Sequence, residues 1–113
     1  MSTIEQLSAQ RAMSEIASAE RLAERFADAC RTNDPRGVFC KDATVEIKSS
    51  TSTVRLRGDQ IAAGWADVNP GPTQILRTVP TIRGFVTEHD RAVWLCDVRD
   101  GRISNAVGWM VER

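Results

Sequence analysis

The apolar positions between Ile16 and Cys30 recur every three or four residues, which is the spacing of one face of an α-helix. Phe26 belongs to this stripe, and the residues between its members are mostly polar or charged. The run Asn-Asp-Pro at residues 33–35 follows directly and is typical of a helix end. We therefore predict a core helix over residues 16–32.

Residues 1–15 keep a looser apolar pattern than the segment that follows them. One straight helix across both segments would be about 45 Å long, which exceeds the diameter of a domain of this size. The pattern therefore predicts that residues 1–15 form a helical extension, separate from the core helix, that folds back over the domain or reaches a partner. Residues 16–113 then form the single folded domain.

Strand-like alternation begins after the predicted core helix. The segments ATVEIK (residues 43–48) and TVRLR (residues 53–57) each alternate apolar with polar residues, and the serine-rich stretch between them suits a hairpin connection. A helical pattern follows, which places Ile61, Trp65 and Val68 on one side. We predict a β-hairpin and then a short helix.

The C-terminal part of the chain has the pattern of strands. Residues 73–85 predict one long strand, in which Pro80 requires a bulge or an edge position because it lacks an N–H group. Residues 91–98 and 102–112 predict two further strands. They flank Asp100-Gly101, which is a strong signal for a two-residue hairpin turn.

A two-residue turn at Asp100-Gly101 determines which residues of the two strands face each other. It predicts that four facing pairs share one face of the sheet, namely Val98–Ile103, Cys96–Asn105, Trp94–Val107 and Ala92–Trp109. The other face is also largely apolar or small, and a sheet that is apolar on both sides must be covered on both sides. We therefore predict that helices cover one face and that a second copy of this chain covers the other, as a homodimer through the sheet.

Charge and composition narrow the class of function. The 113 residues include 15 basic and 15 acidic side chains, so the formal net charge is zero. This balance argues against nucleic acid or an anionic membrane as the main partner. The single histidine, His89, lies in a polar turn and is expected to be exposed, and the cysteines lack the CxxC spacing. These are too few ligands for a metal site, and no cofactor is expected.

The sequence also indicates a compartment. The N-terminal residues lack the basic and apolar segments of a secretory signal, and no apolar stretch approaches the length of a membrane span. Cys30, Cys40 and Cys96 form an odd set, which favours free thiols in a reducing environment. We therefore expect a cytoplasmic location.

Three segments of the chain resemble one superfamily. RFADACRTNDP at residues 25–35 is similar to the end of the first helix of SnoaL-like, or nuclear transport factor 2-like, proteins. VFCKDATVEI at residues 38–47 is similar to their entry into the first strand, and RGDQIAAGW at residues 57–65 to their third helix. The resemblance implies an α+β cone, in which a curved antiparallel sheet packs on about three helices around an internal pocket. It also implies one more strand after the C-terminal hairpin, so we expect a shorter sheet or a partner that completes it.

Within this superfamily the segments most resemble those of the bacterial ketosteroid isomerases, and this resemblance can be followed residue by residue. Phe26 stands where these isomerases place a tyrosine that donates to the oxyanion, and Ile47 where they place the aspartate that is the general base. Trp109 stands near their second donor. A phenyl ring donates no hydrogen bond and an isoleucine carries no proton. We therefore expect no ketosteroid isomerase activity by this mechanism, and no catalytic residue is identified.

What the resemblance preserves is the location of a pocket. It predicts that the ligand-binding residues inside the cone are Phe26, Ile47, Trp94, Cys96, Asn105 and Trp109. Three functions remain open. They are an isomerase, cyclase, epoxide hydrolase or dehydratase acting on a small hydrophobic molecule, a non-catalytic binder of such a molecule, and a dimerisation or scaffolding module with a filled cone. An empty pocket favours the first two functions, and a filled cone favours the third.

Overall fold

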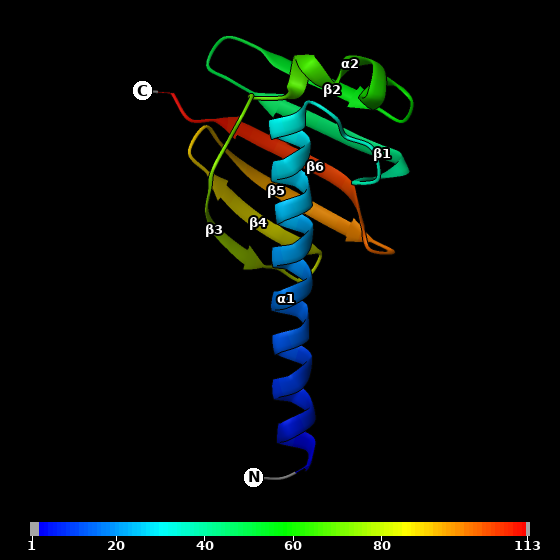
Figure 1. Ribbon diagram of the computed structural model, residues 1–113, viewed down its shortest axis with the longest axis vertical. Coiled ribbons are helices and arrows are strands. Elements are labelled where there is room, and N and C mark those ends of the chain that lie inside the picture. Colours follow the sequence, from blue (N-terminus) through cyan, green and yellow to red (C-terminus); the bar gives the residue numbers. More distant parts are fainter. Residues whose placement is uncertain (1–2, 113) are drawn as a thin grey trace.

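The computed structural model describes the chain from residue 3 to residue 112, and its side chains from residue 6 onward. This part of the chain forms one sheet with α1 lying across one of its faces (Figure 1). The elements in chain order are α1 (Thr3–Thr32), β1 (Phe39–Lys48), β2 (Thr53–Arg57), α2 (Gln60–Val68), β3 (Ile75–Pro80), β4 (Gly84–His89), β5 (Ala92–Arg99) and β6 (Arg102–Met110). The fold is α+β as predicted. It has two helices rather than about three within residues 3–112, because the segment between α1 and β1 is a turn.

The sheet has the strand order β2-β1-β6-β5-β4-β3. Its neighbouring strands are antiparallel except for β1 and β6, which pair in parallel. A parallel pair needs a long connection, and here β2, α2 and the strands β3 to β5 lie between β1 and β6 along the chain. The sheet is therefore mixed, which corrects the expectation of an antiparallel sheet at this one pair.

The long strand predicted over residues 73–85 is divided into β3 and β4. Pro80 ends β3, and the following turn is closed by two hydrogen bonds. The N–H of Thr81 donates to the carbonyl oxygen of Gly84 at 2.9 Å, and the N–H of Gly84 donates to Thr81 Oγ1 at 3.1 Å. With this additional hairpin the described residues form a six-stranded sheet. The predicted long strand is therefore two strands joined by a turn.

Helix α1 runs without a break across residue 15, so the predicted extension and core helix form one element. Its buried positions begin at Ala19 and continue through Phe26 to Cys30. The side chains of residues 6–18 are exposed or partly exposed, and Figure 1 shows this part of α1 extending beyond the sheet. Although α1 is 30 residues long, no helix in the described part of the chain is apolar enough to cross a membrane.

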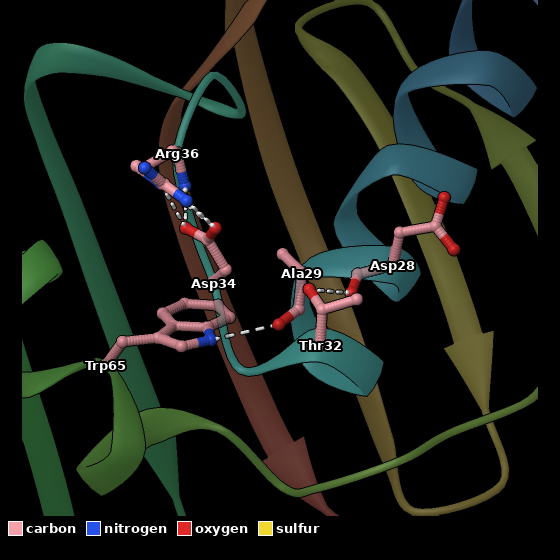
Figure 2. Close-up of polar contacts among 6 residues, drawn as sticks. All are labelled: Asp28, Ala29, Thr32, Asp34, Arg36 and Trp65. Atoms are coloured by element: carbon pink, nitrogen blue, oxygen red, sulfur yellow. Dashed lines mark hydrogen bonds and ion pairs between the residues drawn. The ribbon is translucent and has the colours of Figure 1, made fainter.

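Two side chains, one in α2 and one just after it, bind the C-terminal end of α1. The last carbonyl groups of a helix have no partner within the helix. The indole N–H of Trp65 donates to the carbonyl oxygen of Ala29 at 3.1 Å, and the amide of Asn69 donates to that of Cys30 at 3.1 Å. Figure 2 shows the Trp65 ring reaching Ala29 at the end of α1. These bonds attach α2 to α1 and complete the hydrogen bonding of a buried indole.

Candidate functional site

The predicted hairpin turn at Asp100-Gly101 is present, but the register of β5 and β6 shifts by one residue beyond it. Val98 faces Ile103 as predicted, whereas Asp97 faces Asn105, because a bulge lies between these two pairs. Successive side chains of a strand point to opposite faces, so the extra residue moves every later side chain of β6 to the other face. The facing pairs predicted beyond Val98–Ile103 are therefore wrong.

The bulge places two of the predicted ligand-binding residues on the outer face of the sheet. Asn105 Oδ1 accepts a hydrogen bond from the hydroxyl of Thr44, which satisfies it within the sheet. Trp109 is 43% exposed, and Lys48 Nζ lies 5.8 Å from the centroid of its ring. The prediction that Asn105 and Trp109 meet the other site residues inside the cone is corrected by this register.

Aromatic rings fill the space between α1 and the inner face of the sheet. The ring centroid of Phe26 lies 4.9 Å from that of Trp94, 6.1 Å from that of Phe39 and 6.2 Å from that of Trp65. Gly108 makes room for this packing, because a Cβ atom there would lie 2.7 Å from the Trp94 ring. The protein's own side chains thus occupy the place where the internal pocket is predicted.

Ile47 and Cys96 are buried on the same inner face as Trp94. Ile47 pairs with Val54 on one side and with Gly108 on the other. It also lines a small hollow of about 280 Å³ at the end of α2. The structure therefore brings Phe26, Ile47, Trp94 and Cys96 to one side of the sheet, where they are part of the packed core.

His89 lies at the end of β4 and is 1% exposed, against the prediction of an exposed turn residue. Burial lowers the pKa of its imidazole to about 4, so the ring is neutral at neutral pH. Within residues 6–112, neither ring nitrogen of His89 has a hydrogen-bond partner, and neither has Trp94 Nε1. The alternation of Phe85, Thr87 and His89 toward the core is the sequence signal that places this imidazole inside.

A larger recess lies at the edge of the domain. A half-open groove of about 750 Å³ is bounded by α1, the β3–β4 turn and the β5–β6 turn. Its floor includes Leu22, Phe85 and Val98, and polar residues of its rim are Ser14, Ser18, Arg21, Arg25, Thr81 and Arg83. The groove is not predicted from the sequence, because the β3–β4 turn, which forms one wall, falls inside the predicted long strand.

No protein-family model matches the sequence, and no curated protein matches it. Solved structures do match. An NTF-2 like protein of unknown function from Burkholderia xenovorans LB400 has a TM-score of 0.67 at 14% identity, over 88% of this chain and 87% of that chain. An LEH-like epoxide hydrolase from M. tuberculosis has a TM-score of 0.64 at 18% identity, over 84% of each chain. A candidate ketosteroid isomerase from Kribbella flavida DSM 17836 has a TM-score of 0.63 at 16% identity, over 86% of this chain and 80% of that chain.

The chain has the NTF2-like fold. This confirms the fold implied by the three sequence segments. At this level of identity the likeness concerns the arrangement of the backbone, because a fold supports many functions and a site must be argued from its own residues.

The two cysteines that are buried within residues 6–112, Cys30 and Cys96, are held in the thiol form at neutral pH. Burial raises the pKa of the Cys30 thiol to about 12, and it also raises the pKa of the Cys96 thiol. The thiolate is the nucleophilic form of cysteine, so both thiols stay unreactive. Phe26 and Ile47, at the positions that resemble the isomerase site, carry no proton to transfer.

Proposed function

We propose that this NTF2-like domain binds a small apolar molecule without transforming it, in the groove between α1 and the β3–β4 turn. The groove carries the proposal because it combines an apolar floor with a volume of about 750 Å³. Small-molecule sites usually have volumes of about 300–1,000 Å³. We therefore propose that the ligand binds at the edge of the domain, because aromatic side chains fill the interior.

The residues around the groove support binding rather than catalysis. Glu15 is the single carboxylate among the lining residues and is exposed to solvent. His89 lies at the other end of β4, about 13 Å along the strand from Phe85. General acid–base catalysis needs a proton-transfer group within hydrogen-bond reach of the substrate. For this reason, the reactions named for the isomerase and the epoxide hydrolase of the same fold are not proposed for this groove.

Filling the groove with a side chain tests the proposal. Ser18 is exposed and lines the groove, so Ser18→Trp is expected to occupy it without disturbing the core. Glu20→Trp is the control, because it puts the same ring on an exposed position of α1 outside the lining residues. The probe is Nile red, a neutral dye whose fluorescence rises in apolar surroundings. We expect the unmodified protein and Glu20→Trp to enhance the emission equally and Ser18→Trp to lose most of the enhancement. Equal enhancement by all three proteins contradicts the proposal.

We also propose that the outer face of the sheet joins two copies of this chain. The register places Val79, Val86, Leu95 and Val107 in one row across four neighbouring strands. Both helices pack on the opposite face, where the buried core lies. Burial of apolar surface favours association, so this row supports a homodimer. Such assembly is compatible with a ligand in the groove, which lies at the edge of the domain.

Light scattering with a charge placed on this row tests the dimer. Leu95 is at its centre and 40% exposed, so Leu95→Lys is expected to give a monomer. Met13→Lys is the matched control, because it adds the same charge to an exposed apolar residue of α1. We expect this control to remain a dimer. A monomeric unmodified protein at high concentration overturns the assembly.

We propose a cytoplasmic location, which the cysteines support. Cys30, Cys40 and Cys96 carry free thiols, and two of them are buried. A reducing compartment keeps thiols in this state. Fractionation of the native cells should recover the protein with cytoplasmic markers, and recovery from an oxidising compartment contradicts the placement.

A further inference from the structure

We propose that the groove selects an amphipathic anion, that is, an apolar molecule with one negatively charged head group. In this arrangement Arg21 and Arg83 hold the head group at the rim, and the apolar floor receives the rest of the molecule. The inference rests on the proposed function, because it specifies the class of ligand for the same groove. It is carried by the excess of positive charge around an apolar surface.

The charges around the groove are unbalanced. Its lining residues include the arginines Arg21, Arg25 and Arg83, against the single carboxylate of Glu15. The ion pairs formed within residues 6–112 use a different set of arginines, namely Arg31, Arg36, Arg55 and Arg99. The described carboxylates therefore leave the guanidinium groups of the groove without an ion-pair partner. A chain with a formal net charge of zero thus concentrates positive charge at this recess.

The wall that carries Arg83 is held firmly by backbone contacts. Besides the two bonds that close the β3–β4 turn, the N–H of Val98 donates to the carbonyl oxygen of Arg83 at 2.8 Å. Gly84 permits this close approach, because a Cβ atom there would lie 2.2 Å from the carbonyl oxygen of Cys96. A fixed backbone reduces the conformational entropy that is lost when a ligand binds, so the backbone that carries the Arg83 side chain is placed in advance.

The opposite wall is α1, which carries Arg21 and Arg25 about one turn apart. Arg25 donates to the carbonyl oxygen of Gly37, which fixes its position beside the groove. Arg21 donates to Ser18 Oγ at 3.2 Å. A guanidinium has five N–H donors, so both arginines keep donors available for a ligand.

An anionic head group fits these walls better than a neutral or a cationic one. Guanidinium groups bind a carboxylate through two parallel hydrogen bonds, which adds affinity and fixes the orientation of the ligand. The apolar tail loses contact with water over Leu22 and Val98 on the floor. A neutral ligand of the same length uses the floor alone, and a cationic one is repelled by the arginines.

The test compares three probes of equal chain length by isothermal titration calorimetry, namely octanoate, octan-1-ol and octylammonium. At low ionic strength we expect octanoate to bind about ten-fold more tightly than octan-1-ol, the ratio that one charge-assisted hydrogen bond supplies. Added salt should reduce this ratio, because it screens exposed charges. The double variant Arg21→Gln/Arg83→Gln should lose most of this preference, with Arg25 as the remaining arginine of the groove. Arg77→Gln, which removes an exposed arginine from β3 outside the groove, should keep the preference.

The outcomes separate this inference from the function on which it rests. If octanoate and octan-1-ol bind the unmodified protein equally, the selection of anions is wrong, while binding in the groove stands. If the double variant keeps the preference for octanoate, the assignment to Arg21 and Arg83 is wrong. If none of the three probes binds and Ser18→Trp leaves the Nile red emission unchanged, the proposed function itself fails.

Discussion

The two halves of α1 belong to one continuous helix and lie in opposite surroundings. The half that begins at Ala19 buries Phe26 among the aromatic rings of the core. The half before it extends beyond the sheet and leaves Leu7 60% and Met13 70% exposed. Helix formation is local and continues past the point where packing ends, whereas the free energy of folding comes mainly from the packed face. The wall of the groove therefore spans both halves, from Ser14 to Arg25, whereas the stability comes from the half that begins at Ala19.

Among the substitutions that test this difference between the two halves, Phe26→Ala is expected to lower the free energy of unfolding most. Phe26 touches the aromatic cluster from α1 and is fully buried, so its removal leaves a cavity. Truncation of a buried Phe costs about 3–5 kcal/mol of the free energy of unfolding. Urea unfolding followed by circular dichroism measures this loss. A loss below about 1 kcal/mol would show that the interior half is not the packed one.

Acidification is expected to destabilise the same interior through His89, whose ring lies 6.0 Å from that of Phe26. Burial lowers its pKa from 6.5 to about 4, while Asp90 and Glu24 act in the opposite direction and Arg31 adds to the lowering. In the unfolded chain His89 therefore binds a proton below about pH 6.5, whereas in the folded chain it does not bind this proton until the pH falls to about 4. This contribution to stability is present above pH 6.5 and is lost as the pH falls toward 4, by about 3 kcal/mol.

The pH dependence can be assigned with one substitution. His89→Leu removes the titrating group and keeps an apolar side chain in the core. Urea unfolding at a series of pH values should show that the variant lacks the part of the decline between pH 6.5 and 4 that the unmodified protein has. An unchanged profile in the variant means that the decline belongs to other groups.

Gly108→Ala is expected to have a smaller effect on the interior. Its new Cβ atom would meet the Trp94 ring at 2.7 Å, so the ring must move within a filled core. Overpacking of this kind costs about 1–3 kcal/mol. Thermal unfolding measures the change, and Gly101→Ala is a poor control because Gly101 has a positive φ of 75°. Ala62→Gly, at an exposed position of α2, gives the cost of a glycine–alanine exchange without this contact.

Met13→Ser is expected to have the smallest effect. Met13 is 70% exposed on the free half of α1, so the substitution removes no packed contact. Its effect on the free energy of unfolding should stay within about 0.5 kcal/mol in the same urea experiment. A loss comparable with that of Phe26→Ala would show that this half of α1 is packed in solution, for example against another copy of the chain.

The sequence predicts the elements of this fold better than their register. Ile61, Trp65 and Val68 are the buried residues of α2, as their helical spacing predicts, and the β1–β2 hairpin lies where the alternation places it. These elements have one apolar and one polar face, so their pattern has a single solution. Strands β5 and β6 are apolar on both faces, and a one-residue shift leaves such a pattern equally satisfied. For this reason the sequence does not predict the bulge, nor the orientation of Asn105 and Trp109 that depends on it.

The sequence does not predict the groove, which is the candidate site, for a related reason. The groove depends on where the β3–β4 turn lies, and that turn contains Thr81, Ile82 and Arg83 rather than a strong turn dipeptide. The sequence identifies the aromatic residues of the cone, but it does not decide whether they line a cavity or fill one. Only the distances between Phe26, Trp94 and their neighbours distinguish a pocket wall from a core.

The position of β6 has a consequence for how the molecule is made. This strand is the last one that residues 3–112 form, and it lies in the interior of the sheet, between β1 and β5. During synthesis the β1–β2 hairpin leaves the ribosome well before its neighbour exists, so the edge of β1 stays unpaired until β6 follows. Pairing over such a separation along the chain is slow, and unpaired strand edges invite aggregation in the meantime. A nascent chain that stops before β6 holds two small sheets with no strand to join them.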